Sequence, residues 1–111
     1  PDKCAAYINE VRKRAYGDKF EQHKYIAGDY ADNEWAILQE RDKEFVGEGS
    51  RWFDLLRLRD SNGKPFVFSV KAHYGSSLPI LTEDKAYMML WPVNVEVLNG
   101  DPESKQTPGY E

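Results

Sequence analysis

The sequence predicts a mainly α-helical single domain, on two observations. Apolar residues recur at spacings of three and four over residues 2–15 and again from Asp32 onward, which is the period of an amphipathic helix. Alternating apolar residues, which indicate strands, occur only in short stretches. The chain has 111 residues, of which 41% are hydrophobic and 14% aromatic, so we treat residues 1–111 as one globular domain.

The first predicted helix spans residues 2–15. Asp2 is a suitable N-cap, and cationic residues in the last turns suit the negative end of the helix dipole. Its apolar stripe consists of Ala5, Ile8, Val11 and Ala15. Residues 17–31 combine glycines, aromatics and mixed charge, which predicts a loop that contains about one helical turn.

A long core helix of about 25 residues is predicted next, with Asp32 as its N-cap. Its wide apolar face includes Leu38, Phe45, Trp52 and Leu56. Gly47 and Gly49 are unfavourable there, because each costs up to about 1 kcal/mol against alanine inside a helix. Either the helix breaks at these glycines, or another segment passes close to them. The Pro-Gly-Tyr tail is one candidate for that segment.

Residues after the long helix predict less regular structure. SNGKP at 61–65 has turn chemistry, and FVFSV at 66–70 alternates as a short strand does. Residues 86–91, AYMMLW, are a possible partner strand, which would complete a short β-hairpin.

The last segment predicts one helical turn and an extended C-terminal tail. Asn94 is a candidate cap for the turn VEVLN, and Gly100 would end it. Residues 100–111 include two prolines and two glycines, and Tyr110 near the end is expected to pack back on the domain.

Composition excludes several functions. The net charge of −4 argues against a nucleic-acid surface, and no polybasic membrane patch is present. Cys4 has no internal disulfide partner, while His23 and His73 are too far apart in sequence to indicate a metal site. No run of about 18 apolar residues predicts a spanning helix. No cofactor is expected.

Acidic residues from 44 to 54 raise two alternatives. Glu44 and Glu48 could act as the paired carboxylates of a glycoside hydrolase. However, Glu48, Arg51, Asp54 and Arg57 follow one another at intervals of three, which allows a chain of ion pairs along one helix face. Interleaved apolar residues suggest partial burial, and a buried charge must be paired. We therefore favour a structural network, with Trp52 in the core beside it.

Aromatic residues are the other candidates for function. Trp35 lies in the helical stripe, as Trp52 does, and is expected in the core. Tyr25, Tyr30 and Tyr74 fall in predicted loops, where a ring can present its face to a ligand. Sugars stack on such faces through their C–H groups while polar side chains bind their hydroxyls.

Three stretches, in order, resemble one protein family. They are AAYINEVRKRAYG (5–17), ILQERDKEFVGEGSRWFDLLRLRD (37–60) and LWPVNVEVLNGDPESKQTPGY (90–110). The first two carry Asn-x-Val-Arg-x-Arg-Ala and Arg-Trp-Phe-Asp-Leu patterns, and the third is similar to a Pro-Gly-Tyr ending. The chain thus resembles the C-terminal portion of the SusD/RagB family of nutrient-binding lipoproteins. Asn94, Asp101 and Thr107 stand where the family usually has Pro, Asn and Asn.

The resemblance implies a cell-surface protein of the Bacteroidetes outer membrane that binds glycans without catalysis in polysaccharide utilisation. It implies a SusC-like TonB-dependent transporter as partner. It also implies a tetratricopeptide-like N-terminal half outside these residues, which would carry a lipid anchor. Only that anchor would contact the membrane. The resemblance also assigns only structural roles to Glu48, Arg51, Trp52 and Asp54. Three alternatives stay open: the hydrolase, a peptide ligand, and a purely structural fragment whose ligand site lies elsewhere.

Overall fold

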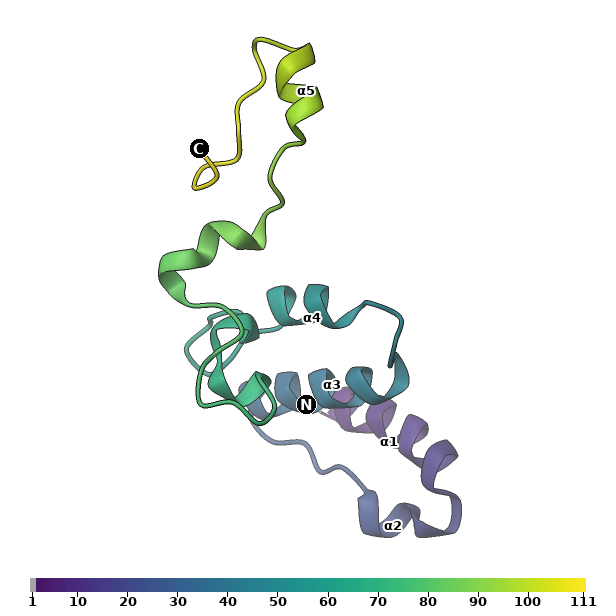
Figure 1. Ribbon diagram of the computed structural model, residues 1–111. Coiled ribbons are helices and arrows are strands. Elements are labelled where there is room, and N and C mark those ends of the chain that lie inside the picture. The colour runs from purple at the N-terminus through teal and green to yellow at the C-terminus, as the bar shows by residue number, and fades with distance from the viewer. Residues whose placement is uncertain (1) are drawn as a thin grey trace.

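The computed structural model describes residues 2–111, which form helices joined by loops (Figure 1). A mainly helical fold is therefore confirmed. The molecule is elongated, with extents of 61 × 27 × 26 Å. Helices α1, α3 and α4 form its body, and a C-terminal arm, which we define as residues 82–111, extends away from them (Figure 1).

Helix α1 (Asp2–Tyr16) matches the first predicted helix, and it buries Ile8. A 3₁₀ turn, η1 (Gly17–Lys19), and the one-turn helix α2 (Phe20–His23) follow it, so this segment holds more helix than the single turn predicted. α1 packs against both α2 and α3.

The predicted long helix is wrong as one element, because it is two helices. α3 (Tyr30–Glu44) is followed by a turn and by α4 (Arg51–Arg57), so the chain reverses and α4 lies alongside α3 (Figure 1). α3 also begins earlier than predicted: the side chain of Asp29, not Asp32, is the cap and accepts a bond from the Asp32 N–H at 2.8 Å.

Left-handed backbone at two glycines explains the break. Gly47 has φ 79° and Gly49 has φ 75°. These angles lie in the left-handed region, which is unfavourable for residues that carry a side chain. Nothing lies within 4 Å of the position a Cβ would take at either glycine. The alternative that the Pro-Gly-Tyr tail passes close to them is therefore wrong: the glycines serve the turn.

The core lies where α3 and α4 meet the segment that follows. Its buried residues are Leu38, Leu55, Leu58, Phe66, Val67, Ala72 and Leu81. Trp35 and Trp52 pack against this cluster, as expected. The ring centres of Trp35 and Phe66 are 5.4 Å apart.

The predicted β-hairpin is not formed by the described residues. FVFSV makes two 3₁₀ turns, η2 (Phe66–Phe68) and η3 (Val70–Ala72), and the proposed partner lies in and after η4 (Glu83–Met89). Consecutive Phe66 and Val67 are both buried, so the alternation in sequence does not correspond to two faces. The one isolated bridge among residues 2–111 pairs Arg59 with Pro65, around the predicted turn.

The arm contains the helical turn predicted at Asn94. α5 (Val95–Gly100) begins with the Asn94 side chain accepting the Glu96 N–H at 2.8 Å. The tail then folds back beside residues 87–93, where the Tyr110 hydroxyl donates to the Leu90 carbonyl at 3.2 Å. Tyr110 thus packs on the arm rather than on the helical body.

No helix in the described part of the chain has both the length and the apolar character needed to cross a membrane.

Candidate ligand-binding site around Tyr74

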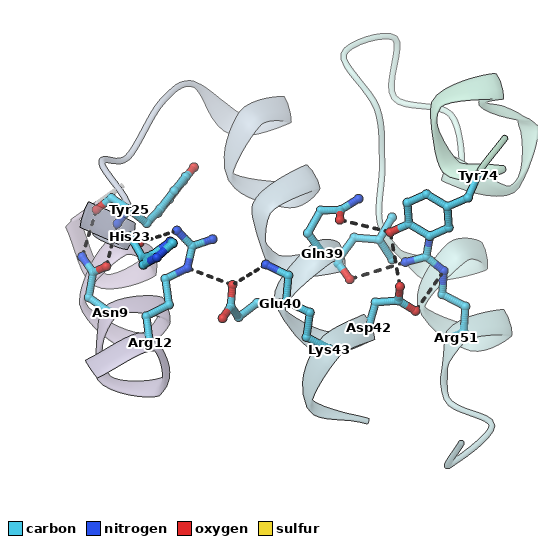
Figure 2. A network of polar contacts seen from close by, with 11 residues as sticks. Asn9, Arg12, His23, Tyr25, Gln39, Glu40, Asp42, Lys43, Arg51 and Tyr74 are labelled. Carbon is cyan, nitrogen blue, oxygen red and sulfur yellow. Dashed lines mark hydrogen bonds and ion pairs between the residues drawn. The ribbon is translucent and has the colours of Figure 1, made fainter. Parts of the chain in front are cut away.

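Tyr74 is exposed on the surface of the helical body, in the turn that follows η3. Its side chain is 59% exposed. Its hydroxyl lies 3.0 Å from Oε1 of Gln39 and 3.2 Å from Oδ2 of Asp42, both on α3 (Figure 2). With a single proton, the hydroxyl donates to one of these oxygens at a time. These contacts fix the ring while leaving much of it open to solvent.

Arg51 completes this group of side chains. Its guanidinium carbon lies 5.4 Å from the centre of the Tyr74 ring, and its Nε is 3.5 Å from Oδ1 of Asp42. Its other nitrogens donate to the carbonyls of Leu38 and Ala72 at 3.5 and 3.3 Å. Arg51 therefore connects α3, α4 and η3 underneath the ring (Figure 2).

We call Gln39, Asp42, Arg51 and Tyr74 the Tyr74 cluster. It combines an exposed aromatic face with an amide, a carboxylate and a guanidinium. An aromatic face with a few convergent polar groups is the arrangement that saccharide sites use, because ring C–H groups pack on the π face while hydroxyls need donors and acceptors.

Tyr25, the second candidate, is occupied by structural contacts. Its hydroxyl donates to Oδ1 of Asn33 at 2.8 Å, and its backbone N–H donates to Asn9 at 2.7 Å. The guanidinium of Arg12 lies 5.7 Å from the ring centre. Burial is the largest cause that raises the pKa of Tyr25 above its ordinary value. These contacts tie the loop at residues 24–29 to α1 and α3.

Tyr30, the third candidate, lies in the first turn of α3 rather than in a loop, and its side chain is exposed. It lies far along the sequence from Tyr74, and no described contact joins the two. The structure therefore brings none of the three predicted tyrosines together.

The predicted ion-pair chain forms only in part. Asp54 accepts from Arg57 at 2.9 Å, as the spacing predicts. Arg51 pairs with Asp42 instead of Glu48 or Asp54. Glu48 is exposed, because it lies in the turn that separates the helices, so its place in the network was predicted wrongly. The i, i+3 rule fails there because the helix is interrupted.

Asp54 is the buried member of the network. Its residue is 3% exposed, and its second oxygen accepts from Nε of Arg41 at 2.7 Å. A parallel contact joins α1 to α3, where Nε of Arg12 donates to the buried Glu40 at 2.9 Å (Figure 2). Each buried carboxylate is therefore paired across two helices.

Neither proposed catalytic acid has the surroundings of an acid–base pair. Glu44 forms an ion pair with Arg14, and Glu48 lies exposed on the turn. Within residues 2–111 no group of three or more His, Cys, Asp or Glu side chains could hold a metal ion.

Gln39 and Asp42 as partners of Tyr74, and Arg41 as the partner of Asp54, were not predicted from the sequence. Arg41 follows Glu40 in the second of the three stretches that resemble the family, and this Glu-Arg pair was the signal for it. Gln39 and Asp42 carried no signal, because their contact with Tyr74 spans 35 and 32 residues.

Comparison with known proteins identifies the family. The described residues form a helical fold, and the SusD family model matches residues 1–110. A crystal structure of a SusD superfamily protein from Bacteroides fragilis NCTC 9343 is similar, with 44% identity and a TM-score of 0.83. The alignment covers 97% of this chain and 23% of that chain.

The chain therefore belongs to the SusD family, and it spans about a quarter of the length of the solved relative. No curated protein matches it.

Proposed function

We propose that the chain is part of a protein that binds oligosaccharides at the bacterial cell surface without converting them. Membership of the SusD family is the observation that carries this proposal, because it supports a role in glycan binding and nutrient uptake. The solved relative comes from Bacteroides, which is consistent with a Bacteroidetes outer membrane.

The Tyr74 cluster is our candidate for the place of binding. A sugar ring would stack on the exposed face of Tyr74, and Asp42 and Gln39 would bind its hydroxyls. The ring is already fixed by its contacts with α3, so binding would cost little side-chain entropy there. Loss of a central aromatic contact typically weakens binding by about tenfold or more.

Binding of the chain to a panel of oligosaccharides, measured by calorimetry, tests this assignment. Tyr74→Ala should weaken binding about tenfold or more, and Tyr74→Phe should retain most of it, because stacking survives. Tyr7→Ala, at an exposed tyrosine on α1 outside the cluster, is the matched control. Equal affinity of Tyr74→Ala and the unchanged chain would remove Tyr74 from the site.

The same panel separates the other functions. Turnover of a polysaccharide that disappears in Glu44→Gln or Glu48→Gln would establish a hydrolase instead. Peptides included in the panel would reveal a peptide ligand. Binding by a longer SusD-type protein that contains this chain, with none by the chain, would favour the purely structural role.

Delivery to a SusC-like TonB-dependent transporter is the second part of the proposal. It predicts a transporter gene beside the gene for this chain, and co-purification of the two products from outer membranes. A lipid anchor on the complete protein would hold it on the cell surface, so protease added to intact cells should digest it. Recovery in the periplasm would contradict this location.

A further inference from the structure

The C-terminal arm exposes an apolar segment that the helical body does not cover and that the tail, through Tyr110 against Tyr87, covers only in part. Neither η4 nor α5 contains a buried residue. The exposed apolar side chains between residues 87 and 97 are Tyr87, Met88, Leu90, Trp91, Val95 and Val97. Trp91 is the most exposed of these side chains, at 77%. Aromatic residues and methionine concentrated on one exposed segment are typical of interfaces.

The end of the arm is held by its own contacts and not by the helical body. The side chain of Gln106 bonds the Val93 N–H at 2.7 Å and its carbonyl at 3.1 Å, and Thr107 donates to the Trp91 carbonyl at 3.0 Å. Among the described residues, hydrogen bonds of positions 90–111 stay within the arm. Met89 is the last hydrophobic residue of the arm that packs against the core cluster.

The solved relative has a chain about four times as long, and the alignment that includes the arm covers 97% of residues here with a TM-score of 0.83. The arm therefore has a similar fold in the longer relative, although the helical body of this chain does not support it. That combination indicates that contacts from outside residues 2–111 support it.

The net charge of the arm indicates what kind of surface the partner has. Residues 82–111 contain six acidic and two basic side chains. Since complementary charge favours correct docking, the partner surface should be apolar at its centre with basic residues around it. Interfaces whose centres are apolar are typical of permanent contacts rather than transient ones.

We propose that the apolar segment 87–97 is the contact surface for the polypeptide that SusD-type proteins carry outside the matched quarter. Trp91 and Leu90 would be its anchors, because they are large and among the most exposed apolar residues of the arm. The inference rests on family membership and not on glycan binding.

The test compares one substitution in two settings. One is this chain alone. The other is the Bacteroides fragilis protein with its matched quarter replaced by this chain. Trp91→Ser should leave the melting temperature of the chain alone unchanged, because the side chain is already in solvent. In the longer protein it should lower the melting temperature by about 5 °C or more.

Ile26→Ser is the control, since Ile26 is 84% exposed and lies outside the arm, in the loop before α3. It should have little effect in either setting. An equally small effect of Trp91→Ser in both settings would overturn the proposal. So would failure of the longer protein to fold while the natural Bacteroides protein folds under the same conditions. Trp91-dependent dimers of the chain in sedimentation would assign the segment to a second copy instead.

Discussion

Arg41 and Asp54 join α3 to α4 through an ion pair of 2.7 Å that spans the glycine turn between the two helices. Asp54 is almost completely buried, and its other partner, Arg57, lies on the surface. The contact makes the polar network a connection between helices instead of a row of charges along one helix.

Arg41→Ala should destabilise the fold by about 2 kcal/mol, because the buried carboxylate of Asp54 would keep only an exposed partner. Arg57→Ala removes that exposed partner and should cost less than about 1 kcal/mol. Urea unfolding of both variants measures the difference. Equal small losses would show that Asp54 is solvated in solution.

Sequence periodicity predicted α1 and the Asn94 cap because the signals for both lie within a few residues. It failed at residues 45–50, where the apolar period continues through two glycines. Whether a helix continues there depends on the φ angles of the glycines, which an apolar spacing does not encode. Once the chain turns back, the partner of a charge comes from another helix.

The same limit applies to the candidate site. An exposed aromatic in a turn-rich segment predicted Tyr74 as a residue of interest. Its polar neighbours come from α3, more than thirty residues away, and their position depends on how η3 packs. The spacing placed Arg51 between Glu48 and Asp54 in a chain of ion pairs, whereas in the structure the buried Asp54 pairs with Arg41.

Gly47→Ala and Gly49→Ala should each destabilise the fold by about 1 kcal/mol, since both positions require positive φ. Steric overlap does not contribute, because space around both is open. Gly100→Ala, at a glycine in α5 with no positive φ, is the control and should be neutral or slightly stabilising. Chemical denaturation gives the three values. A cost at Gly100 as large as at Gly47 would argue against backbone conformation as the cause.

Tyr25 should make the N-terminal part of the fold sensitive to alkaline pH. Burial raises its pKa above the ordinary value of 10.0, so the fold favours the neutral phenol that donates to Asn33. The stability that this group contributes is complete below pH 10 and is lost as the pH rises through the higher pKa of the folded state.

Unfolding free energies measured from about pH 8 to about pH 11 should therefore fall more for the natural chain than for Tyr25→Phe. The substitution removes the titrating hydroxyl and keeps the ring under Arg12. Parallel pH profiles for the two proteins would show that the hydroxyl is equally free in the folded and unfolded states.

Gly109→Ala should detach the tail from the arm without unfolding the core. Gly109 has φ 95°, and a Cβ there would overlap the ring of Tyr87. That ring packs edge-on against Tyr110 with centres 5.1 Å apart. Because the arm lies outside the core cluster, its contacts can open separately.

Hydrogen exchange provides the readout for this tail substitution. The amide of Val93, which donates to Gln106 at 2.7 Å, should exchange faster in Gly109→Ala, whereas the amide of Leu58 in the core should not change. Tyr110→Phe, which removes only the bond to Leu90, should give a smaller increase at Val93. If both amides accelerated together in Gly109→Ala, the arm and the core would form one cooperative unit, and the tail would stabilise the whole chain.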